Sequence, residues 1–136
     1  MIYFVVSLAS GLLFGIMDGF ANANPLATRL YQLYNPVART AVNVPAGIVI
    51  DLVYGFLMAA IYLLLYHSLP GGLGIIKGVS YALLMWFFRV VMSVLSQWVM
   101  FNIPYSSVLY TAGAGLVELL VIGMLYGLTL KPKEEE

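Results

Sequence analysis

Four long apolar stretches, separated by short polar segments, make up most of this chain and limit what it can fold into. They cover approximately residues 2–22, 44–66, 75–101 and 105–130. Each is as long as the roughly 20 residues that a helix needs to cross a hydrocarbon core about 30 Å thick. Hydrophobic residues form 62% of the 136 positions and charged residues only 9%, more apolar surface than a soluble domain of this length can bury. The sequence therefore predicts an all-α integral membrane protein with four transmembrane helices in one domain, residues 1–136.

The short connections predict that these helices form two helical hairpins. Pro70 and the glycines after it end the second stretch, and only Asn102, Ile103 and Pro104 separate the third from the fourth. The first stretch could be read as a signal peptide, because Ala21, Asn22 and Ala23 look like a small-residue cleavage site, but no Lys or Arg precedes it. We therefore expect it to be a retained helix.

The polar segment 24–43, between the first two stretches, carries a helical pattern of its own. Asn24 followed by Pro25 is typical of a capped helix start. Apolar residues then recur at helical spacing, namely Leu26, Leu30, Leu33, Tyr34 and Val37. The segment is therefore predicted to contain an amphipathic helix lying in the membrane interface. A second Asn-Pro pair, at Asn35 and Pro36, predicts a second capped turn.

An even number of spans places both ends of the chain on one side of the membrane. Lys77 and two lysines of the charged tail 131–136, Lys131 and Lys133, then lie on that side, while Arg29 and Arg39 lie on the other. Because cytoplasmic loops carry an excess of Lys and Arg, this distribution favours cytoplasmic termini.

Each apolar stretch contains one ionisable residue inside it, namely Asp18, Asp51, Arg89 or Glu118. A charge at the centre of a transmembrane helix costs about 2.5 to 3.5 kcal/mol on insertion scales. Four such residues facing lipid would be expensive, so we expect all four to face the interior of the bundle. An arginine side chain in the third helix could then reach a carboxylate on a neighbouring helix.

Three carboxylates and one guanidinium leave two negative charges uncompensated in a medium of low dielectric. Protonation of one or two carboxyl groups, a bound cation or a basic group from another chain could neutralise them. Protonated carboxyl groups in a membrane are typical of proton relays in transporters. The alternative is that Asp18 and Asp51 are hydrated near the membrane surface, which leaves one structural pair between Arg89 and Glu118.

Two further patterns accompany the ionisable residues. Polar side chains at helical spacing predict a lining around them, formed by Tyr54, Ser93 and Gln97. Small residues that allow close approach of helices predict packing faces of the glycine-zipper type, formed by Ser7, Gly11, Gly15, Gly19, Gly123 and Gly127.

Together, these patterns favour a small oligomeric membrane transporter or channel for protons, a cation or a small polar solute. The site residues would be Asp18, Asp51, Arg89 and Glu118. The alternative is an accessory or assembly subunit of a larger membrane complex, with its charges paired to another chain. The chain has no cysteine and a single histidine, His67, and no catalytic motif accompanies the carboxylates. We therefore expect no enzyme activity, cofactor or metal centre. The net charge of zero also predicts no nucleic-acid partner.

Overall fold

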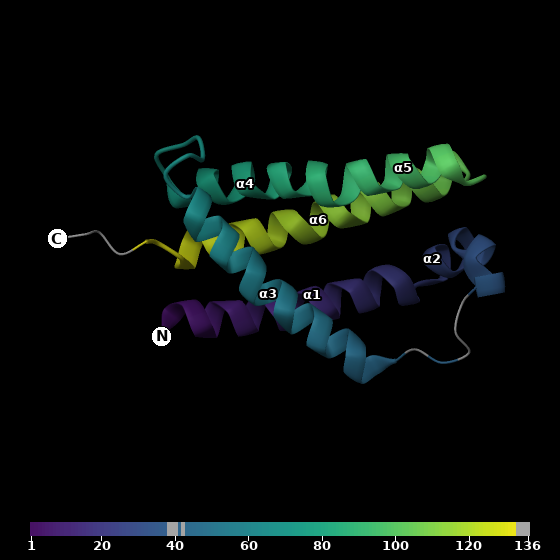
Figure 1. The fold of residues 1–136 in the computed structure, drawn as a ribbon, viewed down its shortest axis with the longest axis horizontal. Coiled ribbons are helices and arrows are strands. Elements are labelled where there is room, and N and C mark those ends of the chain that lie inside the picture. Colours follow the sequence, from purple (N-terminus) through teal and green to yellow (C-terminus); the bar gives the residue numbers. More distant parts are fainter. Residues whose placement is uncertain (38–40, 42, 133–136) are drawn as a thin grey trace.

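The computed structural model describes residues 1–37, 41 and 43–132, and all regular structure in these residues is helical (Figure 1). The elements in chain order are α1 (Ile2–Ala23), α2 (Pro25–Leu30), the 3₁₀ helix η1 (Gln32–Val37), α3 (Val44–Leu65), α4 (Gly74–Met85), the π-helix η2 (Trp86–Val91), α5 (Met92–Met100) and α6 (Tyr105–Thr129). The elements α4, η2 and α5 follow one another directly and form one continuous helix, Gly74–Met100.

In this described part of the chain, four helices are long and apolar enough to cross a membrane. The helices α1 and α3 have 22 residues each, the continuous helix Gly74–Met100 has 27, and α6 has 25. At 1.5 Å per residue the shortest is about 33 Å long, which exceeds a hydrocarbon core of about 30 Å. The all-helical class and the multi-pass membrane character predicted from the sequence are confirmed.

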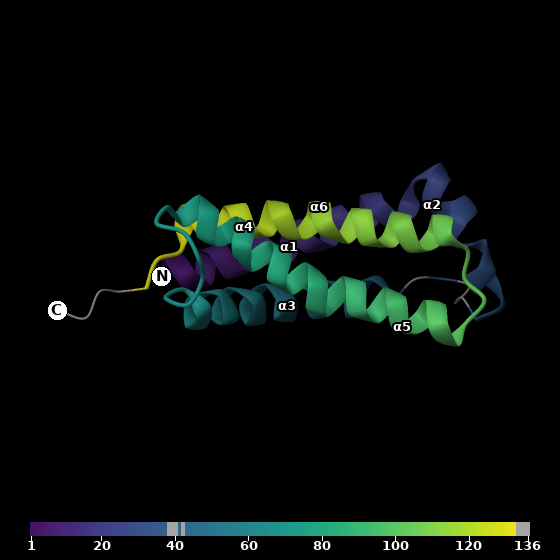
Figure 2. The same cartoon turned by 90° about the horizontal axis from the view of Figure 1, so that it is seen from above.

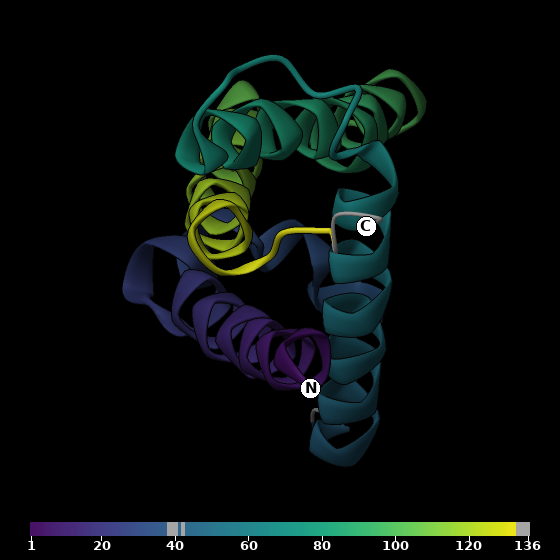
Figure 3. The ribbon, with the colours of Figure 1, turned by 90° about the vertical axis from the view of Figure 1, so that its left-hand side faces the viewer.

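The helix α6 lies between α1 on one side and the continuous helix Gly74–Met100 on the other (Figure 1). Figure 2 shows the same helices from above. The helix α3 packs along α1 but is tilted, and in the view along the bundle it extends from the level of α4 to beyond α1 (Figure 3). The start of α1, the end of α6 and the α3–α4 connection lie at one end of the bundle, and α2 and η1 lie at the other (Figure 1).

Glycines allow α4 and α6 to pack backbone against backbone. A Cβ atom on Gly78 would collide with the carbonyl oxygen of Gly123, and one on Gly123 would collide with the carbonyl oxygen of Gly78. One turn further along the helices, Gly74 and Gly127 have the same reciprocal relation. Close approach of this kind gives helices in a membrane their van der Waals contact.

Small residues also bring α1 close to α3. A Cβ atom on Gly55 would collide with the backbone of Ser7 and Gly11. A Cβ atom on Gly15 would lie 2.9 Å from a side-chain oxygen of α3. Gly19, at the next position of the same spacing, has no atom within 4 Å of the place where its Cβ would lie. The close contact therefore ends before the last turn of α1.

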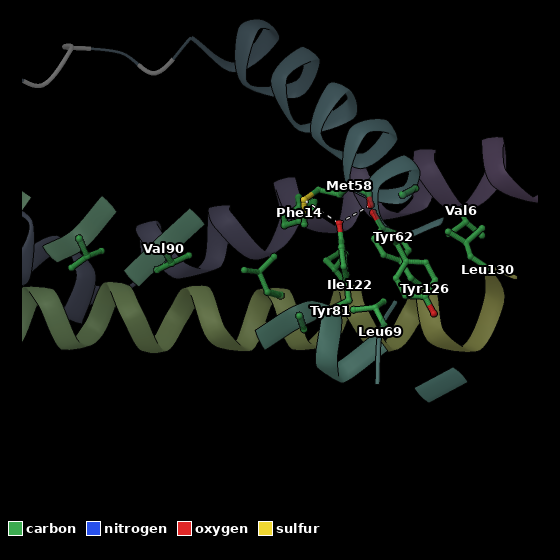
Figure 4. Packing of buried hydrophobic residues seen from close by; sticks show 14 residues of the cluster. Val6, Phe14, Met58, Tyr62, Leu69, Tyr81, Val90, Ile122, Tyr126 and Leu130 are labelled. Atoms are coloured by element: carbon green, nitrogen blue, oxygen red, sulfur yellow. Dashed lines mark hydrogen bonds between the residues drawn. The ribbon is translucent and has the colours of Figure 1, made fainter. Parts of the chain in front are cut away.

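Three tyrosines fill the bundle near the end that carries the termini (Figure 4). The rings of Tyr62, Tyr81 and Tyr126 have centroids 5.2, 5.6 and 6.1 Å apart. The hydroxyl of Tyr81 donates to the carbonyl oxygen of Met58 at 2.7 Å, and that of Tyr126 donates to Oγ of Ser10 at 2.9 Å. We refer to Tyr62, Tyr81 and Tyr126 as the tyrosine core, and it joins α1, α3, α4 and α6.

Asparagine side chains begin two of the helices. Oδ1 of Asn24 accepts a hydrogen bond from the backbone N–H of Ala27 at 2.9 Å and caps α2, as the Asn-Pro pair predicts. The second Asn-Pro pair, at Asn35 and Pro36, lies inside η1 and begins no helix. Instead, Asn43 caps α3.

The predicted interfacial segment 24–43 contains two short helices, α2 and η1. Its residues 38–40 and 42 lie outside the described residues, as do residues 133–136. Two residues used to assign orientation, Arg39 and Lys133, are among these.

Candidate functional site

A cavity of about 530 Å³ lies between α1, η2, α5 and α6, in the half of the bundle that carries α2. Glu118 lies near the middle of α6, about 20 Å along the helix from its start. The cavity therefore extends from the α2 end into the central part of the bundle. Its polar lining consists of Asp18, Asn22, Tyr31, Tyr34, Arg89, Ser93, Gln97, Ser107, Thr111 and Glu118.

Asp18 of α1 and Glu118 of α6 form a carboxyl pair in this cavity. Both side chains line the cavity, and Glu118 is only 7% exposed. Two ionised carboxylates in one buried site repel each other, so ionisation of both at once is disfavoured. A proton shared by the pair, or a bound cation, would remove one of the two negative charges.

Arg89 lies in η2, where the wider π turn interrupts the α-helical register. The centre of its guanidinium group is 4.7 Å from the ring centroid of Tyr54 and 5.2 Å from that of Phe14. Within the described part of the chain, Arg89 forms no ion pair with a carboxylate at 4.0 Å or less. The structural pair between Arg89 and Glu118 is therefore not formed, and the guanidinium group rests instead on aromatic rings of α1 and α3.

Two of the predicted site residues are not part of the cavity lining. Oδ2 of Asp51 lies beside Gly15 at the α1–α3 contact, and the side chain is partly buried there. The ring of Tyr54, three residues further along α3, faces Arg89. Of the four ionisable residues, the structure thus brings Asp18, Arg89 and Glu118 together around the cavity and places Asp51 beside it.

Ser93 and Gln97 continue the polar face of the helix that begins at Arg89. They follow it by four and eight residues, and both line the cavity. Oε1 of Gln97 accepts a hydrogen bond from the hydroxyl of Tyr34 at 3.4 Å. The polar face therefore extends from the middle of the bundle to the segment that covers its α2 end.

The segment 25–37, which contains α2 and η1 and which we call the cap, is held to α6 by polar contacts. Tyr31 and Thr111 share a hydrogen bond of 2.8 Å between their hydroxyl groups. Oγ of Ser107 donates to the carbonyl oxygen of Leu30 at 2.9 Å. Partial burial raises the pKa of the Tyr31 hydroxyl above its ordinary value of 10.0, so the hydroxyl is protonated at neutral pH. The cap thus closes part of the cavity with groups that can exchange hydrogen bonds with water.

Several residues of this site are missing from the sequence-based prediction. Phe14 precedes Asp18 by four residues, a spacing that places both on one face of α1. That spacing was available as a signal for the aromatic partner of Arg89. Tyr31 and Tyr34 carried a weaker signal, since they are polar aromatic residues three apart in the segment that follows Asn24 and Pro25. No pattern in the sequence identifies Thr111 as the partner of Tyr31.

Comparison of the chain with protein-family models, curated proteins and solved structures gives no match.

Proposed function

We propose that this protein is a small membrane transporter or channel that carries protons, a cation or a small polar solute. The observation that carries the proposal is the cavity in the membrane-spanning bundle, with Asp18, Arg89 and Glu118 on three different helices around it. Ionisable residues inside a membrane are costly and are typical of substrate and ion pathways. In this proposal Ser93 and Gln97 provide further hydrogen-bonding groups along the path, and Tyr54 holds Arg89.

The position of the cavity supports a mechanism of alternating access. The cavity lies on the α2 side of Glu118, whereas the tyrosine core fills the bundle on the other side. A solute entering past the cap would therefore meet the carboxyl pair and then a closed barrier. Movement of α1 and α3 relative to α4 and α6 would open this barrier, because the tyrosine core joins the two pairs of helices.

We also infer that α1 with α3, and the continuous helix Gly74–Met100 with α6, act as two helical hairpins. The extensive contact within each pair supports this arrangement. We place the cap in the membrane interface as an amphipathic segment.

Lys77 lies at the end of the bundle that carries the termini. Its Nζ donates to the carbonyl oxygens of Tyr66 and Leu69 at 2.8 and 2.9 Å. Its position supports cytoplasmic termini.

Assembly with further copies is part of the proposal. Only 22 to 28% of the residues in each span are buried within one chain, so most of the apolar surface is free to contact lipid or another protomer. A homo-oligomer would surround the path with more protein, and a complex with other membrane subunits is the alternative. Native mass spectrometry of the protein extracted from its own membrane distinguishes them by mass and composition.

Reconstitution into liposomes tests the proposal. A pH gradient or an inward gradient of a small cation is imposed, and internal pH is followed with a trapped dye. We expect proteoliposomes to dissipate the gradient faster than empty liposomes. If proteoliposomes and empty liposomes show equal rates for protons and for every cation and polar solute tried, the transport function is rejected.

A further inference from the structure

The charge of the cavity favours a cationic ligand. Asp18 and Glu118 line it together with one cation, Arg89. With one proton on the carboxyl pair the three groups sum to zero, and without that proton they sum to minus one. A ligand of charge plus one restores neutrality when the proton leaves. An anion would add to the excess negative charge, which a buried site of low dielectric disfavours.

The size of the cavity indicates a ligand larger than a bare ion. Its volume of about 530 Å³ lies within the range of roughly 300 to 1,000 Å³ that is typical of sites for small organic molecules. A divalent metal ion would need several oxygen ligands at about 2.0 to 2.6 Å. Among residues 1–37, 41 and 43–132, no group of three or more His, Cys, Asp or Glu side chains is placed to hold a metal ion.

The cavity wall offers both kinds of contact that an amine with an apolar body needs. The pair of carboxyl groups accepts N–H donors, and the hydroxyl of Thr111 adds an acceptor. Apolar side chains from α5 and α6, among them Val94 and Val108, line the same space. The ring of Tyr34 borders it at the cap.

We propose that Asp18 and Glu118 bind the protonated amino group of a small organic amine with an apolar body, and that this amine replaces the proton that the two carboxyl groups otherwise share. The released proton passes to water in the cavity. This inference rests on the proposed function, and it makes the transport reaction an exchange of one amine cation for one proton.

Other ionisable groups lie near the pair but make none of its proposed contacts with the amine. Asp51 acts on it from α3, Arg89 from η2 and the hydroxyl of Tyr31 from the cap. Asp51 disfavours a second negative charge on the pair, whereas Arg89 favours it. Tyr31 is neutral at physiological pH. The amine and the proton therefore compete for the pair in the pH range in which its singly and doubly ionised forms are both populated.

Isothermal titration calorimetry of the purified protein in detergent tests the inference, with benzylamine as the probe. Titrations are carried out in two buffers that differ in ionisation enthalpy, so that the difference in heat gives the number of protons released. We expect saturable binding with release of about one proton per amine. Binding without proton release, or no binding, would overturn the inference.

Variants and an uncharged probe make the test specific. Asp18→Asn and Glu118→Gln each remove the shared proton, so we expect proton release to be lost and affinity to fall by about tenfold or more. Asp51→Asn is the matched change outside the cavity, and it should retain proton release and an affinity within about threefold. Benzyl alcohol has the same ring without the charge, and equal affinity for it would show a merely apolar pocket and overturn the inference. This comparison uses the unchanged protein and does not depend on how the variants fold.

The outcome separates this inference from the proposed function. Proton or cation flux in liposomes without benzylamine binding rejects the amine as ligand and leaves transport in place. Benzylamine binding with proton release but no flux of any solute supports the site and rejects transport.

Discussion

The guanidinium group of Arg89 lies 4.7 Å from the ring centroid of Tyr54, and this contact joins η2 to α3 across the cavity-bearing side of the bundle. Phe14 of α1 provides a second ring at 5.2 Å. A cation over an aromatic face is stabilised by the ring quadrupole, most strongly where water is excluded. Aromatic rings thus provide part of the stabilisation that a carboxylate would otherwise supply to Arg89.

Replacement of Tyr54 tests this contact. Tyr54→Leu removes the ring, so the free energy of unfolding should fall by about 0.5 to 2 kcal/mol. Tyr54→Phe keeps the ring and should change it by less than about 0.5 kcal/mol. Unfolding by titration of dodecyl sulfate into mixed micelles, followed by circular dichroism, gives both values. A similar loss in the two variants would show that the hydroxyl group, not the ring, is what matters.

The packing of α4 against α6 gives a second prediction. Gly123→Ala places a methyl group against the carbonyl oxygen of Gly78, so α4 and α6 must separate, and we expect a loss of about 1 to 3 kcal/mol. Gly113→Ala, in the same helix, adds its methyl group where no atom lies within 4 Å. It should leave stability unchanged or raise it, because alanine favours the helix more than glycine does. Equal stability of the two variants in the same titration would contradict this packing.

The four apolar helices could be predicted from the sequence because their lengths match the thickness of a bilayer. The start of α2 could also be predicted, since Asn24 and Pro25 specify the first residues of a helix locally. The pair Asn35–Pro36 was predicted to start a second capped turn, but η1 already begins at Gln32 and contains the pair. The tilt of α3 depends on where backbones meet, which the spacing of glycines alone does not determine.

Part of the site could be predicted because charged side chains in a membrane avoid contact with lipid. This rule predicts that Asp18, Arg89 and Glu118 face the interior of the bundle, but it does not predict which of them are in contact. The π turn at η2 changes the direction of Arg89, and no sequence pattern predicted it. Asp51 follows the same rule as the other three, yet it lies at the α1–α3 contact, beside Gly15, because glycine leaves space there.

Access of water to the cavity gives a third prediction. The chain has no cysteine, so single cysteines report individual positions. Ser93→Cys places a thiol in the cavity lining and should react with a membrane-impermeant maleimide added from the α2 side of proteoliposomes. Ser10→Cys places one beside the tyrosine core, where Ser10 is fully buried, and should not react. Labelling of both positions would show that the tyrosine core is no barrier, and labelling of neither would show that the cavity is closed to water.

Disruption of the cap should speed this labelling. Tyr31→Phe removes the hydrogen bond to Thr111 but keeps the ring, so the cap opens more often. In the Ser93→Cys background we expect labelling to become faster by about two- to tenfold, as the loss of one hydrogen bond of about 0.5 to 1.5 kcal/mol implies. Tyr105→Phe, which changes an exposed tyrosine outside the cavity lining, is the control and should leave the rate unchanged. An unchanged rate in Tyr31→Phe would mean that the cap does not limit access.

The initial rate of proton flux into liposomes containing Glu118→Gln, compared with the unchanged protein and with Asp51→Asn, tests the role of the carboxyl pair in transport. All three proteins are reconstituted at equal density, and an amine gradient drives the flux. We expect Glu118→Gln to lower the rate by about tenfold or more, because it removes the group that shares the proton with Asp18. Asp51→Asn should keep the rate within about threefold. Flux in Glu118→Gln equal to that of the unchanged protein would contradict a path through this pair.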